Sequence, residues 1–371
     1  MDLSLQKTIT FLLFIAIGLL LKLKFKDKEE LTGIKKIILN LALPATIFIA
    51  LLGIQIELSL LLMPVLALAL NIFLFIVFPF ILLLVGFQKS SSHFRTAQLL
   101  MPSLAPGLSC FPFVLEFLGE NYLAKAAMAD LGNKVFVLIV LYLVAMSWYY
   151  KVQAKKGQGH GSKVKSLLKS LLIEPINIFI AVALILVFMG INLESMPYFL
   201  SETLTRLSLL MTPLVLLFIG LAVKIKKKQM IQILSLLALR AGVTILFGAA
   251  LIAVAGIEVA ADRLLLISFG LSACSFWPFA HLSAVDSLEE NSENKTFNPT
   301  FGVNILAISF PFSVMLILGI LSSGNTFANL PILLSVAGLL LVVGVLPIII
   351  RYVKNLRRSK QQNEEVLPVS E

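Results

Sequence analysis

A proline-bearing stretch in the first half of the chain decides the fold: "GLSCFPFVLEFLG" (residues 107–119). Pro102 and Pro106 come just before it, and Pro112 lies within it. A proline removes a backbone hydrogen-bond donor and breaks a helix. The stretch nevertheless lies in a segment apolar enough to cross a lipid bilayer, where an unpaired carbonyl costs several kcal/mol. A helix break at this depth therefore needs a function that compensates for the cost of the unpaired backbone groups.

The composition is that of a membrane protein. Hydrophobic residues make up 59% of the chain and charged residues 13%, whereas soluble domains carry about 25% charged residues. Apolar runs such as residues 60–87 exceed the roughly 20 residues that span a bilayer. The net charge of +10 comes mostly from lysines in short loops beside apolar segments, which indicates contact with a bilayer and not with nucleic acid. Two cysteines and three histidines form no metal-binding or disulfide pattern.

Eleven membrane spans are predicted from apolar runs bounded by charges or turn residues. Their limits are 8–24, 36–53, 59–86, 95–118, 123–149, 168–190, 198–222, 230–255, 264–285, 299–321 and 329–351. Lysines and arginines gather after spans 1, 3, 5, 7 and 11, which places the N-terminus outside and the C-terminus in the cytoplasm. The acidic loop 286–294 departs from this pattern, but acidic residues weigh little in it. We expect the inner (plasma) membrane of a bacterium.

Two motifs recur in the same order along the chain. Pro44 in "LPATIFIALLG" is matched by Pro213 in "TPLVLLFIGL". Pro112 in "GLSCFPF" is matched by Pro278 in "GLSACSFWPF", at nearly the same offset along the chain as the first pair. The matching offsets predict two duplicated units of five spans. Because five is odd, the second unit enters the membrane upside down, which is the inverted repeat of many secondary transporters.

This repeat gives the helix breaks a role. Paired broken helices in such folds meet near the bilayer midplane, and their free N-terminal N–H groups bind an anion. We therefore predict paired discontinuities at residues 106–112 and 272–278. The alternative, that these prolines only kink their helices, stays open.

The predicted chain is an all-α polytopic protein with two repeats and additional segments. The expected divisions are a first five-helix repeat (1–150), a basic cytoplasmic linker (151–166), a second inverted repeat (167–321), an extra transmembrane helix (322–351) and a cytoplasmic tail (352–371).

Five stretches carry a resemblance to a known family. They are "ILNLALPATIFIALLG" (38–53), "GLSCFPFVLEFLG" (107–119), "PLVLLFIGLAV" (213–223), "SFWPFAHLSAV" (275–285) and "GVNILAISFPFSVMLIL" (302–318). In them the chain resembles the auxin efflux carrier family of permeases, within the bile acid–sodium symporter superfamily. The resemblance covers about residues 1–321. It implies ten helices in two inverted repeats, two proline-marked crossover helices, and transport of organic anions such as auxin or dicarboxylates.

One departure from the family pattern bears on the substrate. The plant exporters have Asn on both sides of the crossover proline, whereas Phe111 and Phe113 flank Pro112 here, and Trp277 and Phe279 flank Pro278. This difference argues against an indole-acetate substrate.

Candidate site residues lie at the breaks and among the polar residues within spans. The expected substrate-binding residues are Ser109, Cys110, Pro112, Ser272, Ser275, Trp277, Pro278 and Arg240. The candidates for coupling to an ion or proton are Asp130, Asn133, Lys134, Asn71 and His281. Arg240 can bind a carboxylate bidentately, or it can tie carbonyls of neighbouring helices. Asp130 and Lys134 are four residues apart, so they can form a structural ion pair or contact substrate.

We expect a secondary transporter of small organic anions that works by alternating access, with the substrate held where the broken helices of spans 4 and 9 cross. The alternatives are a sodium-coupled symporter of the bile acid type and a membrane sensor or channel. An enzyme is disfavoured because no reactive constellation is visible. No cofactor is expected; coupling to Na⁺ or H⁺ is left open, as is assembly into a homodimer.

Overall fold

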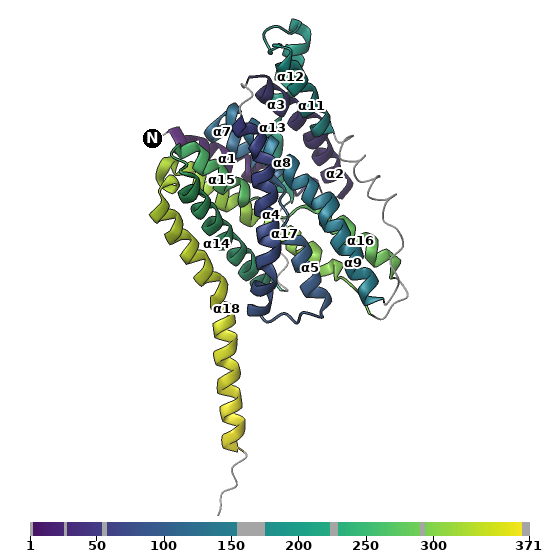
Figure 1. Ribbon diagram of the computed structural model, residues 1–371, viewed down its shortest axis with the longest axis vertical. Coiled ribbons are helices and arrows are strands. Elements are labelled where there is room, and N and C mark those ends of the chain that lie inside the picture. The colour runs from purple at the N-terminus through teal and green to yellow at the C-terminus, as the bar shows by residue number, and fades with distance from the viewer. Residues whose placement is uncertain are drawn as a thin grey trace, which may run out of the picture.

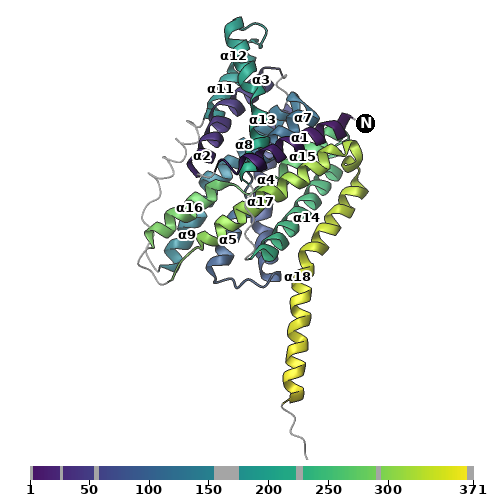
Figure 2. The same ribbon diagram turned by 180° about the vertical axis from the view of Figure 1, so that it is seen from behind.

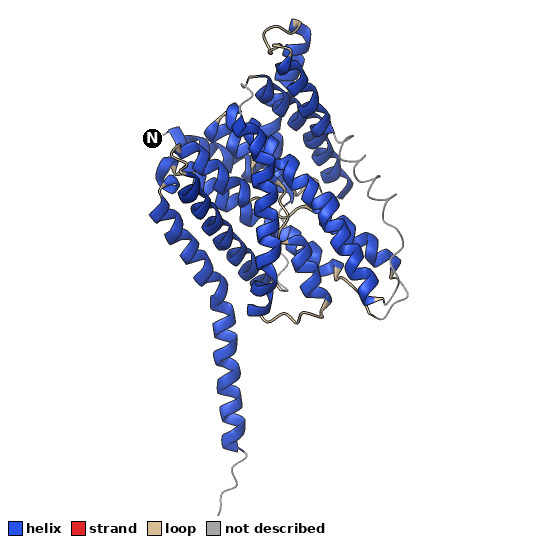
Figure 3. Ribbon diagram, in the orientation of Figure 1, coloured by secondary structure: helices blue, strands red, loops and turns tan. Residues whose placement is uncertain are grey.

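The computed structural model describes residues 3–25, 28–53, 58–153, 175–222, 229–289 and 294–365 (Figure 1). Every regular element in these ranges is a helix (Figure 3). The expected all-helical architecture is therefore confirmed for the described residues. Residues 154–166, most of the expected linker, lie outside them.

The first half of the chain supplies helices α1 to α9. Their bounds are α1 (Leu3–Leu21), α2 (Lys28–Ile37), a π-helical segment η1 (Ile38–Ala42), α3 (Leu43–Leu52), α4 (Leu58–Leu84), α5 (Ser92–Leu100), α6 (Pro106–Ser109), α7 (Phe111–Leu118), α8 (Glu120–Val135), a second π-helical segment η2 (Phe136–Val140) and α9 (Leu141–Val152).

The second half supplies helices α11 to α18. Their bounds are α11 (Pro175–Phe188), α12 (Tyr198–Leu209), α13 (Met211–Ala222), α14 (Met230–Ala255), α15 (Ala260–Gly270), α16 (Phe276–Leu288), α17 (Pro299–Ser322), a short 3₁₀ helix η3 (Gly324–Ala328) and α18 (Leu330–Glu365).

Seven helical stretches of the described chain are long and apolar enough to cross a membrane. They are Glu29–Leu52, Leu60–Leu84, Glu120–Val152, Tyr198–Leu221, Met230–Ala255, Pro299–Ser322 and Leu330–Pro347. Two shorter apolar helices, Ile9–Leu21 and Asn177–Phe188, accompany them. The predicted spans 4 and 9 are absent from this set because each is divided into shorter helices by an interruption.

The interruption in span 4 begins earlier than the sequence predicts. Helix α5 ends at Leu100, residues 101–105 are not helical, and Pro106 starts α6. Proline favours the first turn of a helix, where its missing N–H has no intrahelical partner. Pro106 and Pro112 therefore begin helices α6 and α7, with a second irregularity between them at Cys110 (φ −130°, ψ −49°). The interruption in span 9 covers residues 271–275, and Pro278 lies in the first turn of α16.

Close packing of α4 against α8 places the polar residues of these two helices. Gly132 in α8 lies against the backbone of Pro64 in α4, so closely that a Cβ atom at residue 132 would collide with the Pro64 carbonyl. Small residues allow this approach between membrane helices. The contact holds Asn133 of α8 within hydrogen-bonding distance of Asn71 of α4.

Helix α18 packs along α14 and then extends beyond the ends of the other helices (Figures 1 and 2). It is one continuous helix to Glu365, although the apolar pattern predicts that the span ends near residue 351. After residue 351 the sequence is rich in Lys, Arg, Gln and Glu. These residues have a high helix propensity although they are not apolar. The helix therefore continues through the first residues of the predicted tail.

Candidate functional site

The two interruptions are hydrogen-bonded to each other. Ala105 N–H donates to the Ala273 carbonyl at 2.8 Å. Ala273 N–H donates in turn to Ser109 Oγ at 3.0 Å, and Ser275 N–H donates to Ser103 Oγ at 2.9 Å. We call residues 101–105 and 271–275, together with Ser109, the crossing. Segments from the two halves of the chain thus share one buried set of bonds.

Side chains of a serine and an asparagine accept hydrogen bonds from two more backbone N–H groups of the crossing. Cys274 N–H donates to Ser309 Oγ at 3.3 Å, and Leu104 N–H donates to Asn133 Oδ1 at 3.2 Å. The N–H groups that the sequence led us to expect as free anion donors are therefore bonded within the protein in this conformation. Burial explains why, since an unpaired N–H in a dry interior is costly.

Arg240 of α14 ties the two interruptions together. Its side chain is buried and donates to three backbone carbonyls. Nε donates to the Met101 carbonyl (2.7 Å), Nη1 to the Ser272 carbonyl (2.9 Å) and Nη2 to the Ser103 carbonyl (3.1 Å). This geometry corresponds to the carbonyl tie that the sequence left open. Direct contact of Arg240 with a substrate carboxylate stays a prediction.

A second group of polar side chains supports the first interruption. Asn133 Nδ2 donates to the Leu104 carbonyl (2.9 Å) and to Asp130 (2.8 Å), while Asn71 Nδ2 donates to the Pro102 carbonyl (2.9 Å). The predicted pairing of Asp130 with Lys134 is confirmed at 3.5 Å, and Lys134 Nζ also donates to Asn177 at 2.9 Å. All these α4 and α8 side chains are buried. The two opposite charges within the span thus face each other.

The structure separates two expected site residues from the crossing. The Trp277 side chain is 38% exposed, and the residue bonds to this region through its backbone N–H, which donates to Ser275 Oγ. His281 lies further along α16, where Nε2 donates to the Val137 carbonyl at 2.9 Å and the ring packs against Tyr142. By contrast, the Cys110 side chain is fully buried at the irregularity between α6 and α7.

Two serines whose hydroxyls accept hydrogen bonds from the crossing escape prediction from the sequence, namely Ser103 within it and Ser309 of α17. Ser103 lies between the prolines of "MPSLAPG" (101–107), and Ser309 lies two residues before Pro311. A small hydroxyl residue beside a proline, where backbone donors lose their usual partners, is the signal that points to such a cap.

A separate buried network lies at the C-terminal end of α16. Glu289 is 2% exposed, and its carboxylate accepts bonds from Thr296 N–H (2.9 Å), Thr296 Oγ1 and Gln153 Nε2 (2.8 Å). Arg95 at the start of α5 donates through Nε to the Thr296 carbonyl at 2.8 Å. The segment before α17 is thereby joined to both α5 and the end of α9.

Comparison with known proteins gives one partial likeness. No family model matches the sequence. A segment of 120 residues is 32% identical to a protein described as an uncharacterized transporter from Methanocaldococcus jannaschii. The matched segment covers 32% of this chain and 35% of that protein, so the likeness spans about a third of the relative's length. Together with the several apolar helices of the described residues, it indicates an integral membrane protein.

Proposed function

We propose that the chain is a secondary transporter of small organic anions, that it works by alternating access, and that the anion is held at the crossing. One observation carries the proposal: two interrupted helices from the two halves of the chain meet in a buried, mutually hydrogen-bonded contact. Irregular backbone at membrane depth is tolerated where it is buried in protein or lines a solute cavity. In transporters built from repeats, such segments form the substrate site.

Polar residues at repeat-related positions support an inverted repeat. Asn71 and Arg240 are separated along the chain by the same offset as Pro44 and Pro213, and both polar side chains donate to carbonyls of the first interruption. The proposed architecture has eleven spans, namely two inverted five-helix repeats and α18 as an additional helix. The auxin efflux carrier family remains the family that we propose, with the N-terminus outside and the C-terminus cytoplasmic.

The proposed binding step exchanges one acceptor for another. A carboxylate that enters the crossing supplies oxygens to N–H groups of Ala273 and Ser275, which are bonded to serine hydroxyls in this structure. Hydrogen bonds to an ionised acceptor are about twice as strong as neutral ones, so the exchange is favourable once the anion has lost its water. Arg240 keeps its three carbonyls and adds positive potential nearby. The Asp130–Lys134 pair is the proposed place where H⁺ or Na⁺ coupling acts.

Uptake into liposomes tests the function. The purified protein is reconstituted, sodium and proton gradients are imposed separately, and a panel of labelled aliphatic, aromatic and dicarboxylic acids is screened. We expect saturable uptake of at least one acid that responds to one of the gradients. Absence of carrier-dependent movement for the whole panel, with folded protein in the vesicles, would refute the proposal.

A further inference from the structure

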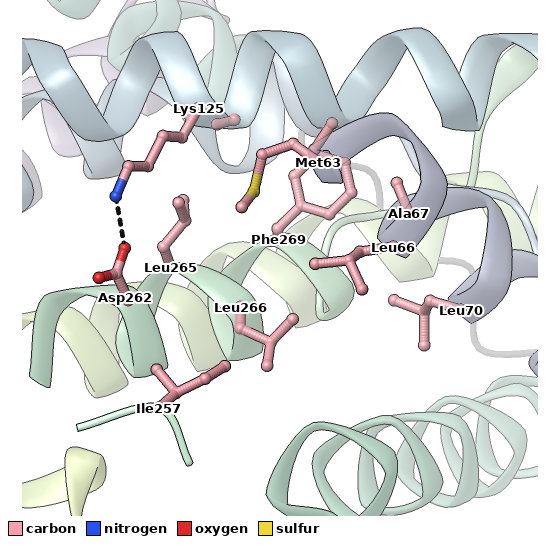
Figure 4. Close-up of a pocket in the computed structure, with 12 residues that line it drawn as sticks. Met63, Leu66, Ala67, Leu70, Lys125, Ile257, Asp262, Leu265, Leu266 and Phe269 are labelled. Atoms are coloured by element: carbon pink, nitrogen blue, oxygen red, sulfur yellow. Dashed lines mark hydrogen bonds and ion pairs between the residues drawn. The ribbon is translucent and has the colours of Figure 1, made fainter. Parts of the chain in front are cut away.

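A cavity of about 210 Å³ lies beside the crossing, between α4, α8 and α15 (Figure 4). Its walls are apolar, with Met63, Leu66 and Leu70 from α4 opposite Leu265, Leu266 and Phe269 from α15. The charged side chains among its lining residues are Lys125 of α8 and Asp262 of α15. An apolar chamber with a few convergent polar groups is the usual form of a small-molecule site.

The two charged residues form an ion pair that joins the two halves of the chain. Lys125 Nζ lies 2.7 Å from Asp262 Oδ1, and the two side chains are 24% and 30% exposed. Each has a second source of stabilisation. Lys125 Nζ lies over the Tyr122 ring, 4.9 Å from its centroid, and Asp262 lies in the first turn of α15, at the positive end of the helix dipole. The pair can therefore separate without leaving either charge unsupported.

The cavity adjoins the crossing through all three helices. On α8, Lys125, Ala129 and Asn133 follow each other at four-residue spacing, so the face that lines the cavity leads to the residue that holds Leu104. On α4, Leu70 immediately precedes Asn71. On α15, the Phe269 carbonyl accepts a bond from Ser272 Oγ at 2.6 Å. On α8 the cavity lining thus ends at Ala129, one helical turn from Asn133, and Lys125 lies one turn further away.

We propose that this cavity binds a compact monocarboxylate with an apolar body, whose carboxylate takes the place of Asp262 on Lys125. The cavity is a second anion site, separate from the N–H groups of Ala273 and Ser275 proposed above, so the inference goes beyond the proposed function. Asp262 is the more exposed partner of the ion pair, so it gains water when it is displaced, whereas Lys125 stays over the Tyr122 ring. The ligand carboxylate therefore replaces the Asp262 carboxylate, while Lys125 stays in place.

The size and lining of the cavity set the body of the ligand. An apolar cavity of about 150 Å³ accommodates benzene, so 210 Å³ suits one aromatic ring with a short substituent or a chain of similar volume. A second carboxylate has no cation among the lining residues, meets the negative charge of Asp262 and loses its water against apolar walls. Benzoate should bind, and succinate should not.

Calorimetric titration of the purified full-length protein with benzoate tests the assignment. We expect Lys125→Gln to weaken benzoate binding at least tenfold and Asp262→Asn to tighten it several-fold, because the latter removes the competing carboxylate. A purely structural ion pair would give changes of the same sign in the two variants. Arg206→Gln is the matched control, because it breaks another ion pair in which the arginine is 76% exposed, outside the cavity lining.

Filling the cavity provides a test that does not depend on charge. Ala129→Leu places a larger side chain in the lining and should abolish benzoate binding, while Ala250→Leu adds the same bulk at an exposed position on α14 and should not. Wild-type affinity in Ala129→Leu would overturn the inference. So would native mass spectrometry that shows a phospholipid retained by the wild type and lost from Ala129→Leu, with no benzoate bound.

Transport measured on the same proteins separates the two proposals. If the liposomes take up an organic anion while the Lys125, Asp262 and Ala129 variants bind and transport like wild type, the cavity assignment is wrong and the transporter proposal stands. If benzoate binds in a Lys125-dependent manner but no anion crosses the membrane, the cavity is a binding site and the transporter proposal fails.

Discussion

Replacing Arg240 tests whether one side chain holds the crossing together. Arg240→Met removes the donor from three buried carbonyls, those of Met101, Ser103 and Ser272. Each buried acceptor left unpaired costs about 1–3 kcal/mol, so the gross loss is roughly 3–9 kcal/mol. Removing a buried charge also removes its desolvation cost, which offsets several kcal/mol. We expect a net loss of about 2–4 kcal/mol in the free energy of unfolding.

Arg240→Lys should lose about half as much. The ammonium keeps the charge, but its three N–H groups radiate from a single nitrogen and cannot reach three carbonyls that are arranged around a planar fork. The assay is reversible unfolding by SDS in mixed micelles, with Arg206→Met as the control because exposed ion pairs contribute about 0–1 kcal/mol. If Arg240→Met unfolds at the wild-type SDS fraction, the three hydrogen bonds of Arg240 contribute nothing to the free energy of unfolding and the reasoning is refuted. Reduced anion affinity in Arg240→Lys beyond its effect on stability would support the predicted carboxylate contact.

Three further changes probe the elements around the crossing. Ser109→Leu or Ser275→Leu should block anion binding sterically, whereas Ser109→Ala should keep or tighten it, because the lost hydroxyl is the acceptor that the carboxylate replaces on Ala273 N–H, and Ser275→Ala, which keeps its backbone N–H, should change it by about 1 kcal/mol or less; equal affinities in the Leu and Ala variants would place the site elsewhere. Gly132→Leu should destabilise the protein by several kcal/mol in SDS unfolding, because its side chain would collide with Pro64; wild-type stability would show that α4 and α8 can separate freely. Glu289→Ala should lower the free energy of unfolding by about 1–3 kcal/mol and Glu289→Gln by less, because the amide keeps an acceptor; identical losses would contradict the hydrogen-bond argument.

The sequence predicts those features that depend on residues close together along the chain. The apolar runs predicted a helical membrane protein, and the four-residue spacing of Asp130 and Lys134 predicted their ion pair. The sequence misplaces the first interruption, because a proline is expected at the centre of a break, whereas Pro106 starts the helix that follows it. The partners of Arg240 are 32 to 139 residues away. No local pattern contains these long-range contacts. The sequence alone therefore leaves two roles open for Arg240, a contact with a substrate carboxylate and a tie to carbonyls of neighbouring helices.

The bonds of the crossing explain how a broken helix can be tolerated and also couple its movement to a solute. Neither interruption is satisfied alone, since Ala105 N–H needs the Ala273 carbonyl and Ser275 N–H needs Ser103 Oγ. Away from water, separating the two segments would leave these donors unpaired at a cost of several kcal/mol. A carboxylate brings several lone pairs to the same place and can accept from Ala273 N–H and Ser275 N–H at once. In the proposed mechanism the empty crossing therefore resists separation, and an anion that accepts from Ala273 and Ser275 N–H lowers the cost of moving the second segment away from the serines of the first, which is the coupling that an alternating-access transporter requires.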